Sequence, residues 1–262
     1  MSADRLLPDI VSLSPSGLDD WERCPRLYLN RHLLRLPPSD DGVSSGLGNL
    51  VHDLLRLLHV SGDCHDERLQ HETLENHGVE ENTAVSAMVR QHAARCPSPS
   101  RAIGHELEVV RLRRGSPVWI GSGRLDAVWS HDGILDIRDY KTGAPRDGSL
   151  AEDSRARFQA WLAAPLAAGG RMRVRYEHLG HDISADPIEY EPDADDLARA
   201  EADLTAVIDA IRHAAARAEF VGVRDREICR TCAYRSICPD SASVGTPTWP
   251  LPDDNGSSLP TS

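Results

Sequence analysis

Residues 119–141, WIGSGRLDAVWSHDGILDIRDYK, decide the fold of this chain. Two runs in which apolar residues alternate with others, 119–129 and 134–141, flank the dipeptide Asp132-Gly133. Asp-Gly between such runs is a strong signal for a two-residue type I′ turn. We therefore expect a β-hairpin in which His131 faces Ile134 and the following residues pair outward from them.

This register brings two carboxylates together. Asp126 is expected to lie directly opposite Asp139, with Cβ atoms about 5 Å apart, and Lys141 follows on the same face because side chains alternate along a strand. Carboxylates this close repel unless a cation lies between them, and hard divalent metals take oxygen ligands. The alternative is a pair of solvated acids with Lys141 as a surface counter-ion. Leu135 and Ile137 share this face, so we expect it to be half buried, and buried charges need partners or a function.

The overall charge narrows the function. The chain has 262 residues, with 29 Lys and Arg against 41 Asp and Glu, and a net charge of −12. This charge argues against broad, non-specific adhesion to nucleic acid. Five arginines could still form a local basic groove, and a solvated face is an equal alternative for them. They are Arg155, Arg157, Arg171, Arg173 and Arg175. With no apolar run of membrane-span length and no signal peptide, we expect a cytoplasmic protein without membrane contact.

The apolar pattern predicts the order helices, strands, helix, strand, helix. Helices are expected to start near residues 14–16 and near Gly48, and to cover 154–166 and 193–219. Strands are expected over 106–113, in the two arms of the hairpin, and over 172–179. The polar stretch 61–100 is expected to form one or two surface helices. We expect one domain over residues 1–240 and a disordered tail over 241–262.

Three cysteines near the end of the expected domain have ligand spacing. Cys229, Cys232 and Cys238 form C-x2-C-x5-C, and Cys24 is the best fourth ligand because its helix has no other need for a thiol. A tetrahedral zinc site and a [4Fe–4S] cluster both remain open, and buried structural thiols are a third, weaker explanation. Cys64 and Cys96 have no companion at ligand spacing, so they are interpreted as incidental.

Several motifs in a fixed order resemble the iron–sulfur-containing RecB-like nucleases. This group lies within the PD-(D/E)XK superfamily and includes the AddB nuclease domain and the CRISPR-associated adaptation nucleases. The matching motifs are SLSPSGLDDWERCP at 12–25, G-x-x-x-H at 48–52, G-x-x-D at 123–126, D-x-K-T-G at 139–143 and the three C-terminal cysteines. The resemblance spans about residues 12 to 240.

The resemblance implies an α/β fold with a restriction-endonuclease-like mixed central sheet flanked by helices. It implies that an iron–sulfur cluster joins the N- and C-terminal parts, held by Cys24, Cys229, Cys232 and Cys238, with structural zinc as the alternative. It further implies that Mg²⁺ or Mn²⁺ is held by His52, Asp126, Asp139 and the carbonyl of Tyr140. Lys141 would orient or activate a water molecule and support charge on the phosphate.

Two further positions follow from the resemblance. Glu106 resembles the acidic residue that precedes the G-x-x-D strand in the family, but Glu108 shares the expected strand face and the choice stays open. Gln159 matches the first position of the family motif Q-x-x-x-Y, where this chain has Ala163 in place of the tyrosine. This departure casts doubt on the usual DNA contact. Trp161 is expected in the core rather than as a stacking platform for bases.

The function implied is a metal-dependent deoxyribonuclease, an exonuclease on single-stranded or end-exposed DNA in repair, recombination or defence. No P-loop motif occurs, so we expect either a stand-alone nuclease or a subunit that works with a separate helicase. The alternative is a catalytically weak DNA-binding or scaffold subunit of a helicase–nuclease or CRISPR adaptation complex, which Ala163 and the acidic charge favour. The complete set of His52, Asp126, Asp139 and Lys141 favours the enzyme.

Overall fold

The computed structural model describes residues 7–38, 46–97, 102–145, 148–180 and 187–242. The chain divides into two compact units. The first comprises Met1–Asp19 and Ser44–Glu219, and the second comprises Asp20–Val43 and Phe220–Ser262. Most of the tail expected at 241–262 lies outside the described residues, from residue 243 onward.

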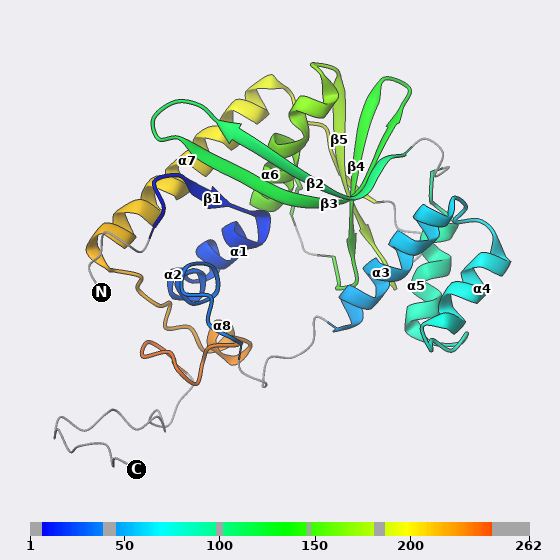
Figure 1. Cartoon of the computed structure of the whole chain (residues 1–262), viewed down its shortest axis with the longest axis horizontal. Coiled ribbons are helices and arrows are strands. Elements are labelled where there is room, and N and C mark those ends of the chain that lie inside the picture. Colours follow the sequence, from blue (N-terminus) through cyan, green and yellow to red (C-terminus); the bar gives the residue numbers. More distant parts are fainter. Residues whose placement is uncertain (1–6, 39–45, 98–101, 146–147, 181–186, 243–262) are drawn as a thin grey trace, which may run out of the picture. The chain divides into compact units, whose positions relative to one another are not determined.

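A mixed sheet forms the centre of the first unit (Figure 1). Its strands are β1 (Val11–Leu13), β2 (Ala102–Arg113), β3 (Trp119–His131), β4 (Ile134–Lys141), β5 (Arg171–His178) and β6 (Ile188–Tyr190). The order is β1-β3-β4-β5-β6, and β2 pairs with β3 in addition. β1 runs parallel to β3 and β4 parallel to β5, while the other neighbours are antiparallel. The fold is thus the expected mixed α/β fold, a central sheet flanked by helices.

The predicted hairpin is present between β3 and β4. The turn residues Asp132 and Gly133 have φ angles of 52° and 75°, both positive as a type I′ turn requires. Backbone pairing runs from His131 opposite Ile134 to Ala127 opposite Arg138, in the expected register.

The pairing of β3 with β4 ends one residue before the expected pair of acids. The Oδ2 atom of Asp126 accepts a hydrogen bond from the backbone N–H of Tyr140 at 2.8 Å, so a side chain takes the place of the strand's own carbonyl. The expected direct opposition of Asp126 and Asp139 is therefore corrected, because the strands part here. Within the described strands, neither β1 nor β4 pairs with residues 122–126, and β3 is open on that side.

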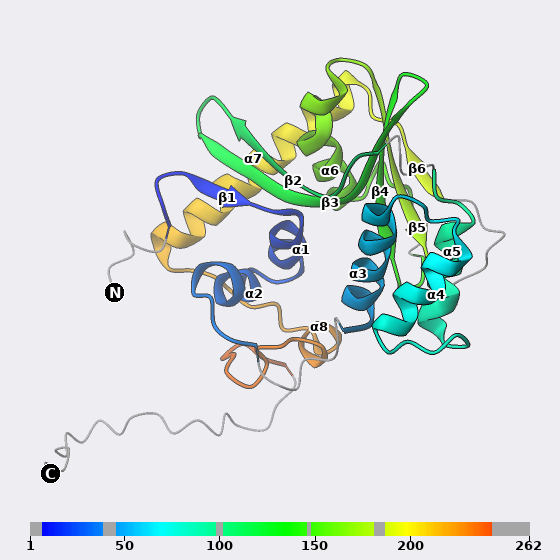
Figure 2. The same ribbon diagram turned by 45° about the vertical axis from the view of Figure 1, so that its right-hand side comes forward.

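Helices cover both faces of this sheet (Figures 1 and 2). α3 (Gly46–Ser61), α4 (Glu67–Asn76) and α5 (Ala84–Ala93) pack against Trp129 and Tyr140 on one face. On the other face α6 (Ser154–Ala163) packs against Ile137 and Val174, with α7 (Ala194–Arg217) beside it. Two hydrophobic cores result, one on each side of the sheet.

The stretch 61–100 differs from its prediction. It forms the two expected helices, but α5 is not a surface helix, because Met88, Val89 and Ala93 are buried in the core. Polar residues of the same helix are buried with them, including Gln91, which donates a hydrogen bond to the carbonyl of His178 at 3.1 Å. The polar composition concealed this role because buried polar side chains that find partners need not face water.

Trp161 lies in the core, as expected. Its ring stacks on that of Trp119 with centroids 4.7 Å apart, and its indole N–H donates to Glu201 at 3.0 Å. Ala163, where the family motif has a tyrosine, is also fully buried. The helix continues beyond it only as a 3₁₀ turn, Ala164–Ala167.

The second unit is built from short helices. They are the last residues of α1 (Pro15–Arg23), α2 (Pro25–Tyr28), the π-helix η2 (Leu29–Leu33) and α8 (Arg226–Arg230). Leu27 and Tyr234 form a small apolar core with Cys24, and the Tyr234 hydroxyl donates to the Leu36 carbonyl at 3.0 Å. Among all the helices that the described residues form, none has both the length and the apolar character of a membrane span.

Candidate functional site

Three side chains of types that can bind a metal ion meet where β3 is open. His52 of α3, Glu106 of β2 and Asp126 of β3 offer ligand atoms that all lie within 4.8 Å of one another. His52 Nδ1 is 3.5 Å from Asp126 Oδ2 and 3.8 Å from Glu106 Oε1. The structure thus brings together residues that span more than 70 positions of the chain. Sequence motifs pointed to His52 and Asp126, and the sequence left the choice between Glu106 and Glu108 open.

A backbone distortion separates Glu106 from Glu108. Glu106 has a φ of 50°, which a residue with a side chain seldom adopts. Alternation along β2 breaks there: His105 stacks on His59 of α3, whereas Leu107 packs in the core of the opposite face. The side chain of Glu106 therefore points to His52, while Glu108 is exposed. Such strained conformations concentrate at functional sites.

The imidazole of His52 has a defined orientation. Its Nε2 atom lies 3.0 Å from the carbonyl oxygen of Tyr140 and must donate, because a carbonyl only accepts. Nδ1 then faces Asp126 and Glu106. Burial lowers the pKa of His52, but these two carboxylates outweigh burial and raise it to about 10. A proton on Nδ1 balances their charge, and a divalent cation could take its place, since metal-binding histidines commonly donate their second N–H to a backbone carbonyl.

The two acids of the hairpin lie in opposite electrostatic environments. Burial and the charge of Asp139 raise the pKa of Asp126. Burial would also raise the pKa of Asp139, but Lys141 and Arg155 outweigh it and lower this pKa. Lys141 forms an ion pair with one oxygen of Asp139, and Gln159 donates to the other at 2.6 Å. Around Asp126 and Glu106 the positive charge comes from His52 and from Arg124, which lies 2.6 Å from Glu106, and a divalent cation could replace the proton of His52.

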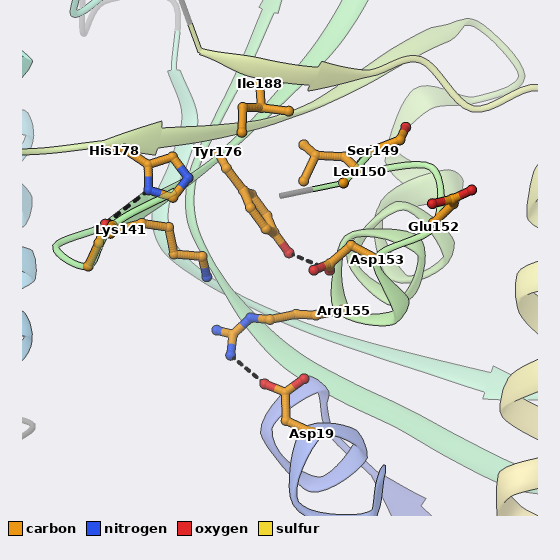
Figure 3. A pocket seen from close by; sticks show the side chains of 13 residues that line it. Asp19, Lys141, Ser149, Leu150, Glu152, Asp153, Arg155, Tyr176, His178 and Ile188 are labelled. Atoms are coloured by element: carbon orange, nitrogen blue, oxygen red, sulfur yellow. Dashed lines mark hydrogen bonds and ion pairs between the residues drawn. The ribbon is translucent and has the colours of Figure 1, made fainter. Parts of the chain in front are cut away.

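Two hollows adjoin these residues and share Arg155. One, of about 510 Å³, contains His52, Glu106 and Asp126. The other, of about 410 Å³, is shown in Figure 3, where Lys141 and Arg155 point toward each other across it.

Arg155 is a site residue that sequence reasoning did not select. It pairs with Asp19 at 3.1 Å and with Asp139 at 3.6 Å. In the sequence, Arg155 stood out only as one of five arginines between residues 155 and 175, and these five do not form one basic groove. The other four pair with acids elsewhere: Arg157 with Asp203, Arg171 and Arg173 with Glu191, and Arg175 with Asp136 and Glu189.

The glycine of G-x-x-D permits a close approach of chain segments. A Cβ atom on Gly123 would lie 2.9 Å from Leu162 Cδ1 and 3.1 Å from Pro15 Cδ. Helix α6 and the start of α1 therefore pack directly on the backbone of β3, three residues before Asp126.

The second unit brings the four predicted cysteines to one cavity. Cys24, Cys229, Cys232 and Cys238 all line it, and all are free thiols. Three backbone amides donate to their sulfur atoms at 3.4–3.5 Å, from Val223 to Cys24, from Tyr234 to Cys232 and from Ala242 to Cys229. Amide donors of this kind stabilise thiolates, the form in which cysteine binds metal.

A second buried group was not foreseen. Cys64 and Cys96, which the sequence left without companions, lie with His59 and His92, and their ligand atoms are all within 4.8 Å of one another. The folded chain therefore gives these two cysteines the companions of ligand type that their spacing along the sequence did not show. The available signal was the pair of spacings H-x4-C and H-x3-C, one at the end of α3 and one at the end of α5.

We compared the chain with curated proteins and with solved structures. Among curated proteins none matches the chain. Solved structures that match include a candidate exonuclease from Eubacterium rectale, with TM-score 0.52, 10% identity and 96% of each chain covered. They also include the crystal structure of SSO0001, with TM-score 0.43, 16% identity, and 91% of this chain and 90% of that chain covered. At 10% identity the likeness to the Eubacterium rectale structure concerns the fold alone.

The family comparison extends over most of the chain. The model of the PD-(D/E)XK nuclease superfamily matches residues 12–239, a span that includes the mixed sheet, the acidic group at the opening of β3 and the four cysteines of the second unit. The chain therefore belongs to the PD-(D/E)XK nuclease superfamily.

Proposed function

We propose that this protein is a divalent-cation-dependent nuclease that hydrolyses DNA phosphodiester bonds, acting as an exonuclease on single-stranded or end-exposed DNA. The observation that carries this proposal is the convergence of His52, Glu106 and Asp126 within 4.8 Å, in a member of this superfamily. The Asp139–Lys141 ion pair lies on the next strand.

The donor set suits Mg²⁺ or Mn²⁺. Carboxylate and carbonyl oxygens suit both ions, and an imidazole nitrogen shifts the preference toward Mn²⁺. His52, Glu106, Asp126 and Asp139 would hold the cation, with the second lone pair of the Tyr140 carbonyl available to it. When bound, the cation polarises the scissile phosphodiester and lowers the pKa of a water molecule.

Lys141 supplies a positive charge beside the reacting phosphate. Its ammonium group is anchored by Asp139 and lies over the ring of Tyr176, 4.5 Å from the centroid, at the edge of the hollow in Figure 3. In this position it would orient the attacking water and stabilise charge that develops on the phosphate. Gln159 would act through Asp139, by holding the carboxylate that anchors Lys141.

Arg155 would bind the nucleic-acid backbone. It lines both hollows, and its guanidinium keeps its charge at any physiological pH. A phosphate next to the scissile one could reach it by exchanging with one of its carboxylate partners.

For the second unit we propose a [4Fe–4S] cluster held by Cys24, Cys229, Cys232 and Cys238. Four thiols around one cavity, with amide donors to three sulfurs, support it. Anaerobically purified protein should be brown, with about four iron and four sulfide per chain, and Cys238→Ser should lose both. Colourless protein with zinc bound by these cysteines would contradict the cluster.

The nuclease activity is tested on labelled single-stranded DNA with Mg²⁺ or Mn²⁺. Lys141→Ala and Asp126→Ala should each lower cleavage by about 10²- to 10³-fold, the loss typical of removing one preorganised charge. Glu108→Ala, which removes an exposed acid from the same sheet, should cleave like the wild type. Equal cleavage by all four proteins would identify a contaminant.

Products of end-labelled strands test the exonuclease assignment. An exonuclease releases label from one end first and leaves circular single strands intact. DNA binding without any cleavage would instead favour the scaffold subunit, the alternative to which Ala163 and the net charge of −12 point.

A further inference from the structure

The helical layer of the first unit encloses four metal-binding side chains away from the nuclease site. His59 lies in the last turn of α3, Cys64 follows that helix, His92 lies near the end of α5, and Cys96 follows α5. Their relative exposures are 4%, 0%, 0% and 5%. No residue of this group belongs to the proposed active site.

The ligand atoms of this group are nearly close enough to share one metal ion. The two histidine Nε2 atoms are 2.9 Å apart, Cys96 Sγ is 3.5 Å from His59 Nε2, and the two sulfurs are 3.0 Å apart. Zinc–ligand bonds of about 2.3 Å to sulfur and 2.0 Å to nitrogen would set these separations at roughly 3.3 to 3.8 Å. The sulfurs are also well beyond the disulfide bond length of about 2.05 Å, and both thiols are free.

We propose that His59, Cys64, His92 and Cys96 bind a structural zinc ion. Two thiolates and two imidazoles in a tetrahedral set are typical ligands of zinc. Because the protein supplies all four ligands and all are buried, no position is left for water or substrate, and the site is structural rather than catalytic.

A second layer of hydrogen bonds orients these ligands. His92 Nδ1 lies 3.3 Å from the buried carboxylate of Glu177 and donates to it, which turns the lone pair of Nε2 toward the centre. The carbonyl of Cys64 accepts from Gln70 at 2.8 Å, and the carbonyl of Cys96 pairs with His65 Nε2 at 3.1 Å. A carboxylate behind a metal-binding histidine is the usual support of a zinc site.

Zinc binds cysteine as the thiolate and histidine as the neutral imidazole. Binding of the ion would therefore release the protons that these four side chains carry without it.

The site connects to the nuclease centre through one helix and one strand. His59 and His52 lie two turns apart on α3. Tyr140 accepts from His52 through its carbonyl, and the edge-on contact of its ring with His92 has a centroid distance of 4.8 Å. Zinc would therefore fix the end of the helix that carries His52.

The test is metal analysis of the full chain, purified without added metal. The wild type should hold one zinc ion per chain, and Cys64→Ser, Cys96→Ser and His92→Ala should hold none. His71→Ala, an exposed histidine of the same helical layer, should keep its zinc. Cys238→Ser should lose the metal of the second unit and also keep its zinc. Glu177→Gln should bind zinc about 10- to 100-fold more weakly.

Cobalt and thiol chemistry decide the matter if the cysteine variants do not fold. The wild type with Co²⁺ in place of zinc should show the visible bands of tetrahedral cobalt together with sulfur-to-cobalt charge transfer. Alkylation in denaturant without reductant should label both Cys64 and Cys96. Wild type that binds neither zinc nor cobalt here, zinc content unchanged by the substitutions, or a Cys64–Cys96 disulfide would each overturn the proposal. Absence of nuclease activity with zinc in place would overturn only the proposed function.

Discussion

The acids of the proposed active site are distinguished by local backbone conformation as much as by residue type. Glu106 and Glu108 have the same charge and lie two residues apart, yet the positive φ of Glu106 directs only its side chain toward His52. Asp126 differs from an ordinary strand residue because its side-chain carboxylate, rather than a backbone carbonyl, accepts the hydrogen bond from the N–H of Tyr140.

This difference between the two glutamates predicts their roles. Glu106→Gln should lower cleavage by about 10²-fold or more, because it removes a charge that would contact the cation. Glu108→Gln should change cleavage less than twofold. Initial rates over a Mn²⁺ titration measure both, and a higher Mn²⁺ requirement is expected for Glu106→Gln only. Equal rates for the two variants would show that Glu106 does not act at the site.

Two motif glycines should respond differently to a methyl group. Gly123→Ala places Cβ 2.9 Å from Cδ1 of Leu162, which is fully buried, and 3.1 Å from Cδ of Pro15. Such overpacking costs about 1–3 kcal/mol of unfolding free energy. Gly143→Ala meets nothing within 4 Å and should be neutral within about 0.5 kcal/mol. Urea unfolding compares the two, and an equal loss would contradict this explanation of the G-x-x-D glycine.

At the scale of elements, α3 carries residues of both proposed metal sites, and α5 is held against it by the buried group at their ends. The buried polar residues of α5 find partners in this position. His92 hydrogen-bonds to the carboxylate of Glu177. Gln91 donates to the carbonyl of His178 and accepts from the backbone N–H of Gly180. The helices α3, α4 and α5 thus combine apolar packing with a buried polar group, whose two thiols would be satisfied by the proposed zinc ion.

Removal of zinc should therefore destabilise this layer. At free zinc 1,000-fold above Kd, binding contributes about 4 kcal/mol to the free energy of unfolding. A zinc chelator should lower the urea midpoint of the wild type and increase hydrogen exchange in α3 and α5. The same chelator should leave the already destabilised His92→Ala unchanged in these helices. Identical exchange in the wild type with and without chelator would contradict a stabilising ion.

At the scale of the whole molecule, the net charge of −12 opposes the approach of a polyanion. DNA binding should then depend on local cations and on the divalent ion that neutralises the acidic group. The isosteric change Asp126→Asn keeps the acceptor for Tyr140 but removes one negative charge from the site.

This charge balance predicts the effect of Asp126→Asn on binding without metal. In EDTA the variant should bind a labelled single strand about fivefold more tightly than the wild type, since like charges 4 Å apart repel by about 1 kcal/mol in water. Glu108→Gln removes the same charge away from the site and should change affinity less. Fluorescence anisotropy measures both, and equal effects would show that only total charge matters.

Much of the architecture could be predicted because it rests on local chemistry. The Asp132-Gly133 turn tolerates positive φ at both positions, and the period of two in the flanking runs sets the register of the hairpin. Those two properties hold whatever the rest of the chain does. They are sufficient to predict that Asp126, Asp139 and Lys141 lie near one another.

The rest depended on packing between distant segments. No local sequence pattern predicts that β3 parts from β4, that Glu106 has a positive φ, or that Arg155 lines both hollows. The group of His59, Cys64, His92 and Cys96 combines the spacings H-x4-C and H-x3-C, which lie about 30 residues apart. Neither spacing alone indicates a metal site. Spacing along the chain records neighbours on one element, whereas a binding site forms where elements converge, and only the folded chain decides that convergence.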